Sequence, residues 1–181
     1  DGEDFNEMIK YLQMVKNINK PVLLHVITKK GFGYEPAEND ETGSFHGVGP
    51  FNIKDGKPKE ISNLPSYSEI MSSYVLNYAK IDKDIIVITP AMEKGCKLSI
   101  IKEKLPKQFS DVGINEEHAL VLASSLAENG KKPICFIYSS FLQRGYDEIV
   151  HDIARMNEHV ILCIDRAGFV SSDGETHQGL F

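Results

Sequence analysis

Apolar residues between positions 66 and 165 recur with two different spacings, and the alternation of these spacings predicts the fold class. Continuous apolar runs predict buried strands at residues 85–89, 109–112, 133–138 and 159–165. Apolar residues at helical spacing predict helices at residues 66–80, 98–105, 115–128 and 142–157. Strands that are apolar throughout and alternate with helices indicate an α/β fold, with a parallel sheet covered by helices on both faces.

The first part of the chain contains only half of a βαβ unit, a helix and a strand without the strand before them. Helical spacing predicts a helix over residues 3–19, and the apolar run at 21–28 predicts a continuous buried strand. Residues 29–63 are polar and rich in Gly and Pro, so we interpret them as a functional loop followed by a linker. After this linker, Ser66 and Glu69 have the spacing of a capping box, which predicts the start of the next helix.

Composition and charge narrow the class of protein. The chain has 181 residues, of which 41% are hydrophobic and 25% charged, as in a globular protein of one domain or two small ones. No apolar run approaches the length of a membrane span, and a net charge of -6 argues against a nucleic-acid surface. Cys96, Cys135 and Cys163 are odd in number and widely spaced, which predicts reduced core residues in a non-oxidising compartment.

Candidate catalytic and binding residues follow the carboxyl ends of the predicted strands. In open parallel sheets a ligand lies beyond the carboxyl ends of the strands, so we consider the residues at those ends first. Several predicted strands are followed by charged or aromatic residues: Lys29 and Lys30, then Glu116, then Tyr138, Phe141 and Arg144, and finally Arg166, Asp173 and His177. The last three belong to a Gly-rich irregular stretch, residues 165–179, and binding groups concentrate on such loops.

Glu116 is the first candidate for catalysis. The stretch Asp111-Val-Gly-Ile-Asn-Glu-Glu-His118 turns from a strand into a helix, with Asn115 as the predicted N-cap. Three residues after that cap stands His118 rather than Glu or Gln, so neither carboxylate is engaged in a capping box and one is free to face a ligand. The alternative is that Glu116 and Glu117 only complement the helix dipole.

The other candidates also have structural alternatives. Asp173 and His177 are equally compatible with ordinary turn residues. A metal cluster that joins them to Glu175 fits no standard ligand spacing. The aromatic residues behind the strand at 133–138 are alternatively core residues, and the two lysines of the first loop are alternatively solvated.

A resemblance to a known family adds to this interpretation. The segments that carry it follow one another along nearly the whole chain: His25-Val-Ile-Thr-Lys-Lys-Gly-Phe-Gly-Tyr-Glu-Pro-Ala-Glu38, Phe45-His-Gly-Val48, Asp111-Val-Gly-Ile-Asn-Glu-Glu-His-Ala119, Ile137-Tyr-Ser-Ser-Phe-Leu-Gln-Arg-Gly-Tyr-Asp147, Val150-His-Asp152, Asp165-Arg-Ala-Gly168 and Ser172-Asp-Gly-Glu-Thr-His-Gln-Gly179. In this combination and order the chain resembles the 1-deoxy-D-xylulose-5-phosphate synthases, which are thiamine-diphosphate enzymes of the transketolase-like group.

The resemblance implies a thiamine-diphosphate-binding fold with the cofactor held between two α/β domains. Residues 1–58 would be the C-terminal part of the diphosphate-binding domain, and residues 59–181 the pyrimidine-binding domain. The family also implies magnesium, but its Gly-Asp-Gly motif with a following Asn does not occur here, so we expect the metal ligands outside this chain. We interpret the chain as an internal portion that is inactive on its own, from a protein that forms a homodimer.

The implied activity is that of a transferase. It decarboxylates pyruvate and transfers the two-carbon unit to glyceraldehyde 3-phosphate, the first step of non-mevalonate isoprenoid precursor synthesis and a step toward thiamine biosynthesis. The alternatives are another transketolase-like enzyme and a non-catalytic α/β module. We expect neither nucleic acid nor membrane as a partner, and a location in the cytoplasm or the plastid stroma, with any targeting segment outside this chain.

By the same resemblance, Glu116 matches the catalytic glutamate, which hydrogen-bonds a pyrimidine nitrogen of the cofactor. Phe141 matches the residue that stacks on the pyrimidine, with Tyr138 and Arg144 beside it. Asp173 and His177 match acid/base and substrate-positioning residues, and His46 matches another active-site histidine. Arg166 matches a ligand of the acceptor's phosphate, and Lys29 or Lys30 matches a residue near the diphosphate end of the cofactor.

Overall fold

The computed structural model describes residues 1–40, 43–59, 64–170 and 175–179 of the chain. Contacts between residues divide the chain into two units, Asp1–Ile61 and Ser62–Phe181. The assignment of residues 1–58 and 59–181 to diphosphate-binding and pyrimidine-binding domains stays a prediction.

The second unit is built on one parallel sheet, and the predicted fold class is confirmed. Its strands are β1 (Ile85–Thr89), β2 (Phe109–Asp111), β3 (Lys132–Tyr138) and β4 (Ile161–Asp165). They lie in the order β2-β1-β3-β4 and every pair is parallel. The strands end together, because Thr89 is in register with Asp111 and Tyr138 with Asp165. The carboxyl ends therefore form one edge of the sheet.

Helices connect and cover these strands. They are α3 (Tyr67–Ile81), α4 (Ser99–Lys104), the 3-10 helix Pro106–Gln108, α5 (Glu116–Glu128), α6 (Ser139–Leu142), the 3-10 helix Gln143–Gly145, α7 (Tyr146–Glu148), the π-helix Ile149–Ala154 and the 3-10 helix Glu175–His177. The predicted continuous helix over residues 142–157 is therefore broken, and helical structure begins earlier, directly after β3. Gly145 supplies a reason for the break, because a Cβ there would lie 2.1 Å from Leu120 Cδ1. The chain approaches α5 more closely than a regular side chain allows.

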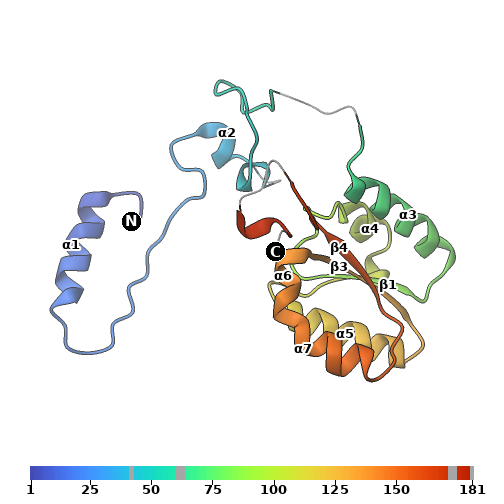
Figure 1. The fold of residues 1–181 in the computed structure, drawn as a ribbon. Coiled ribbons are helices and arrows are strands. Elements are labelled where there is room, and N and C mark those ends of the chain that lie inside the picture. The colour runs from blue at the N-terminus through green and yellow to red at the C-terminus, as the bar shows by residue number, and fades with distance from the viewer. Residues whose placement is uncertain (41–42, 60–63, 171–174, 180–181) are drawn as a thin grey trace. The chain divides into compact units, whose positions relative to one another are not determined.

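Two apolar cores lie on opposite faces of the sheet. Consecutive side chains of a strand point to opposite faces, and Val87 and Ile88 accordingly belong to different buried clusters. The cluster of Val87 includes Val75 of α3 and Ile101 of α4, whereas the cluster of Ile88 includes Leu120 of α5. Figure 1 shows the same layers, with α3 and α4 on one side of the strands and α5 and α7 on the other.

Both helix starts that were predicted from capping residues are confirmed. Ser66 Oγ accepts a hydrogen bond from Glu69 N (3.2 Å), and Glu69 Oε2 accepts one from Ser66 N (2.7 Å), which completes the capping box of α3. Asn115 Oδ1 accepts a hydrogen bond from His118 N (3.1 Å), so α5 begins at Glu116. The short turn between β2 and α5 thus fixes the position of Glu116.

The first unit contains α1 (Phe5–Lys16), the short helix α2 (Glu35–Glu38) and the 3-10 helix Ser44–His46. The prediction of a buried strand at residues 21–28 is wrong, because this segment has no regular structure and Leu23 and Ile27 are exposed. A strand requires a neighbouring strand that satisfies its backbone groups. Among the described residues of this unit there is no strand beside it, and only the hydrogen bond from Gly2 N to Ile27 O (2.8 Å) ties it down.

Candidate active site

The loops that follow β1 and β3 meet at the edge formed by the carboxyl ends of the strands. The chain leaves β1 toward β2 on one side, while β3 lies on the other side, and ligands of open α/β sheets bind at such a switch point. Tyr138, at the end of β3, donates its backbone N–H to Met92 Sδ at 3.1 Å. Its hydroxyl is so close to Gly95 that a Cβ there would lie 1.6 Å from the oxygen. Only glycine at position 95 leaves this tyrosine in place.

Glu116 is a buried carboxylate at this edge of the sheet. Its side chain is 2% exposed, whereas the neighbouring Glu117 is exposed to solvent. Arg144 Nη1 lies 3.1 Å from Glu116 Oε1 and 3.0 Å from Oε2. A buried charge requires a partner, and Glu116 has one in Arg144. Its role is therefore not limited to complementing the dipole at the start of α5.

Aromatic rings from two segments gather beside this ion pair. The rings of Tyr138 and Phe141 are stacked, with centroids 5.7 Å apart and an angle of 27° between their planes. His177 meets the Phe141 ring edge-on, at 5.1 Å and 75°. The guanidinium of Arg144 lies 5.5 Å from the centroid of the Phe141 ring, which links the aromatic cluster to Glu116. The cluster offers flat apolar surface next to a buried acid.

Arg166 joins this cluster from the end of β4. Its guanidinium carbon lies 4.0 Å from the centroid of the Tyr138 ring, a cation–π distance. The structure therefore places Glu116, Tyr138, Phe141, Arg144, Arg166 and His177 in one linked group of contacts. These residues come from β3, from the helices after it, and from the segments that follow β2 and β4.

Comparison with known proteins adds a family to this geometry. The sequence of residues 64–181 matches the family described as the transketolase, pyrimidine binding domain. The chain belongs to this family. The match covers most of the chain and includes every strand of the sheet.

Similarity to known proteins extends over the entire chain. It is 52% identical over 182 residues to the 1-deoxy-D-xylulose-5-phosphate synthase of Geobacillus sp. (strain WCH70), and 50% identical over 182 residues to that of Macrococcus caseolyticus (strain JCSC5402). In both comparisons the whole chain is covered, and it spans 29% of the length of the relative. A solved structure of a split-gene transketolase, an inactive β4 tetramer, matches half of the chain with a TM-score of 0.46 and 22% identity, over 31% of its own length.

Three of the predicted site residues belong to the first unit. Lys29, Lys30 and His46 belong to the first unit, where Lys30 and His46 are exposed. The Lys29 ammonium forms an ion pair with Glu38, and this contact lowers the pKa of that carboxyl. Asp173 lies outside the described residues, so the metal cluster considered from the sequence is only partly described. Within the described ranges, no group of three or more His, Cys, Asp or Glu residues is arranged to hold a metal ion.

Residues to which the sequence assigned no role tie the pyrimidine-binding domain together at this edge. Asp111 Oδ1 accepts hydrogen bonds from Ala91 N (2.8 Å) and Gly113 N (3.0 Å), so it joins the loops after β1 and β2. Ser139 donates its hydroxyl to the backbone carbonyl of Arg166 at 2.9 Å. An aspartate at the last position of a strand is a usable signal for such a role, but the partner of a serine hydroxyl is not readable from sequence.

The cysteines of the pyrimidine-binding domain are structural residues. Cys96 and Cys135 are buried, Cys163 is half-buried, and all three are free thiols, as the sequence predicted. Burial raises the pKa of Cys135 to about 12 and that of Cys163 to about 11, with the Asp165 carboxylate adding to the effect at Cys163. The reactive thiolate is therefore scarce at neutral pH, and we assign these residues no chemistry.

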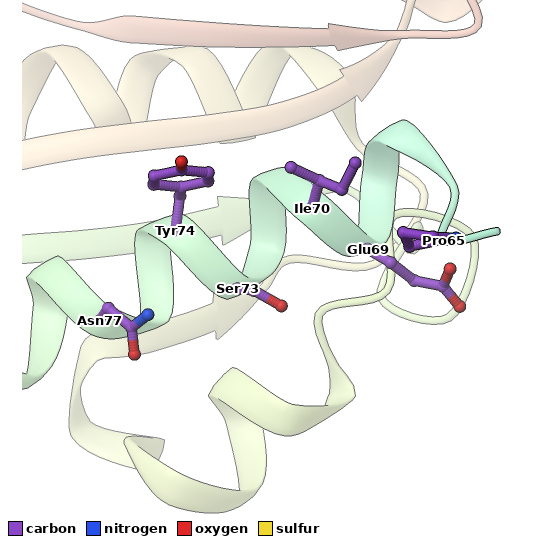
Figure 2. A pocket seen from close by; sticks show the side chains of 6 residues that line it. All are labelled: Pro65, Glu69, Ile70, Ser73, Tyr74 and Asn77. Atoms are coloured by element: carbon purple, nitrogen blue, oxygen red, sulfur yellow. The ribbon is translucent and has the colours of Figure 1, made fainter.

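A hollow in the second unit is lined by none of the predicted site residues. It has a volume of about 340 Å³ and is lined by Pro65, Glu69, Ile70, Ser73, Tyr74 and Asn77. Figure 2 shows that these side chains come from α3 and from Pro65, which precedes the N-cap of that helix, so the hollow lies along one helix. It contains no buried charge and none of the predicted site residues.

Among the described helices, none is both long enough and apolar enough to cross a membrane.

Proposed function

We propose that the complete protein that carries this chain is a 1-deoxy-D-xylulose-5-phosphate synthase. It would be a transferase that decarboxylates pyruvate and passes the two-carbon unit to glyceraldehyde 3-phosphate. The observation that supports this most strongly is identity of 50% and more over the whole chain with bacterial proteins of that name. The chain spans 29% of their length, so the remaining machinery lies in other segments of such proteins.

The chemistry of the described residues fits the aminopyrimidine end of thiamine diphosphate. A heteroaromatic ring with hydrogen-bonding nitrogens requires an aromatic face and a polar group at its edge. Phe141 and Tyr138 provide stacked ring surface, and Glu116 provides a buried carboxylate linked to them through Arg144. When bound, the cofactor supplies a thiazolium ring that acts as the electron sink for decarboxylation.

Glu116 would hold a proton at a ring nitrogen of the pyrimidine. An ionised carboxylate offers about four lone-pair positions, and the bonds from Arg144 Nη1 engage one on each oxygen, so acceptor capacity remains. Burial keeps water from competing for the same positions. The Arg144 guanidinium balances the charge that the carboxylate carries when no proton is shared.

The other residues would orient substrate around this acid. His177, edge-on to Phe141, carries ring nitrogens that can donate or accept a hydrogen bond, which suits an acid/base or positioning role. Arg166 would bind the phosphate of the acceptor aldehyde, since a guanidinium fork matches a phosphate. We propose in addition that Asp173 and His46 act around the substrates, and that Lys29 or Lys30 lies at the diphosphate end.

Further properties of the complete protein follow from the same proposal. Its magnesium would be bound by residues outside this chain. It would form a homodimer. The relatives named above are bacterial, which favours the cytoplasm over a plastid as its location.

The activity is tested with the complete protein, pyruvate and glyceraldehyde 3-phosphate. Formation of carbon dioxide and 1-deoxy-D-xylulose 5-phosphate is expected. A transketolase-like enzyme of other specificity would form no 1-deoxy-D-xylulose 5-phosphate from this mixture, and a non-catalytic module would consume neither substrate. Either outcome would overturn the proposal.

The role of Glu116 is tested by hydrogen exchange at the thiazolium carbon of bound thiamine diphosphate. Glu116→Gln in the complete protein is expected to slow this exchange by about a hundredfold or more, the usual contribution of a positioned acid or base. Glu117→Gln is the matched control, because this neighbour is exposed and should leave the rate unchanged. Equal rates in the wild type and Glu116→Gln would leave Glu116 without a catalytic role.

A further inference from the structure

Arg166 has a backbone conformation that side chains rarely adopt. Its φ angle is +57°, in the left-handed region that favours glycine. A residue stays in such a conformation only when its surroundings hold it there, and held residues of this kind cluster at ligand sites. The contacts of the Arg166 backbone are therefore informative.

Both polar groups of the Arg166 backbone are engaged. Its N–H donates to Asp165 Oδ1 at 2.8 Å, and its carbonyl accepts from Ser139 Oγ and from Gly179 N, both at 2.9 Å. The other oxygen of Asp165 accepts from Ser68 Oγ at 2.7 Å, which fixes the aspartate to α3. The conformation is therefore held by contacts with three separate segments of the chain.

Ser139 binds the Arg166 backbone next to the ring that contacts the Arg166 side chain. It directly follows Tyr138, the ring over which the Arg166 guanidinium lies, so a single pair of residues contacts both the backbone and the side chain of Arg166. Gly179 approaches so closely that a Cβ there would lie 2.0 Å from Ser139 Oγ. Any side chain at position 179 would displace the serine hydroxyl.

We propose that Ser139 is a positioning residue for Arg166. By binding the Arg166 carbonyl it keeps the backbone in the left-handed conformation and thereby the guanidinium over Tyr138, where it meets a phosphorylated acceptor. This inference rests on the proposed function, in which Arg166 binds the phosphate. Ser139 sets the affinity for that phosphate without touching the substrate itself.

The test compares two acceptors in the complete protein, glyceraldehyde 3-phosphate and unphosphorylated glyceraldehyde. Ser139→Ala is expected to raise the KM for the phosphorylated acceptor about fivefold, the factor that the loss of one hydrogen bond commonly gives. The KM for glyceraldehyde, the KM for pyruvate and the kcat should stay unchanged. Ser139→Thr, which keeps the hydroxyl, is expected to restore the KM. An equal loss with both acceptors would indicate a merely structural role and overturn the inference.

A neighbouring serine provides the matched control. Ser140 is also in α6 and is buried, and its hydroxyl has no hydrogen-bond partner in the described part of the chain. Ser140→Ala is therefore expected to leave both KM values unchanged. Gly179→Ala gives an independent approach, because its Cβ would displace the Ser139 hydroxyl and should reproduce the selective rise in KM.

A double-mutant cycle separates this inference from the proposed function. Arg166→Met alone should raise the KM for the phosphorylated acceptor, and if it does not, the phosphate-binding role of Arg166 fails. If Ser139 acts through Arg166, adding Ser139→Ala to Arg166→Met should produce no further change. A further fivefold rise in the double variant, or no rise in Ser139→Ala while Arg166→Met raises the KM, would overturn the positioning role alone.

Discussion

Removal of the Arg144 guanidinium is expected to destabilise the start of α5. Arg144→Met keeps most of the length of the side chain but leaves Glu116 as a buried carboxylate without its cation. Breaking a fully buried pair costs about 3–5 kcal/mol, whereas exposed pairs contribute roughly 0.2–1 kcal/mol. Glu116 is 2% exposed and Arg144 50% exposed, so solvent screens one partner only. We therefore expect the free energy of opening of α5 to fall by about 2 kcal/mol, a value between these two ranges.

Native-state hydrogen exchange of the α5 amides, followed by mass spectrometry in the complete protein, measures this loss as a change in opening free energy. Arg155→Met is the matched control, because Arg155 is exposed and its guanidinium forms a hydrogen bond with His151, which is exposed as well. Glu116→Gln removes the charge, so combining it with Arg144→Met should destabilise the helix by less than the sum of the single changes. Equal exchange in Arg144→Met and Arg155→Met, or strict additivity in the double variant, would refute the reasoning.

Two other predictions concern titrating groups. Bonds from the Ser66 N–H and hydroxyl lower the pKa of Glu69, so their contribution to stability is present above the ordinary carboxyl pKa and is lost as the pH falls through the lowered value. Amide protection in the first turn of α3 should therefore fall between neutral and acidic pH, and an identical fall in Glu69→Gln would contradict this. The pKa of Cys163 is raised from 9.0 to about 11, so its modification at pH 8 by a thiol reagent should be roughly a hundredfold slower in the native protein than after denaturation. Equal rates in the two states would show that burial does not protect the thiol.

Features that depend on neighbouring residues in the sequence could be predicted well. The strands of the second unit were readable because each is a short apolar run, and the start of α5 because Asn115 is a capping residue. The position of Glu116 followed from these two features together. Glu116 is not engaged in a capping box, which left its side chain free to face inward, and it is buried.

Features that depend on tertiary contacts could not be predicted. The run at residues 21–28 has the composition of a buried strand, but whether it becomes one is decided by a partner strand rather than by its own residues. The break in the helix after β3 depends on the approach of Gly145 to Leu120. In the same way, neither the left-handed backbone of Arg166 nor the hydroxyl contact of Ser139 leaves a mark in the sequence pattern.

The contact between Arg144 and Glu116 joins one nitrogen to two oxygens. A fork of two parallel bonds would lock the plane of the guanidinium against the plane of the carboxylate. A contact through a single atom acts instead as a pivot, about which the rest of the group can swing. The arginine is thus able to turn its other N–H groups toward an arriving anion while the buried acid keeps its counter-ion throughout.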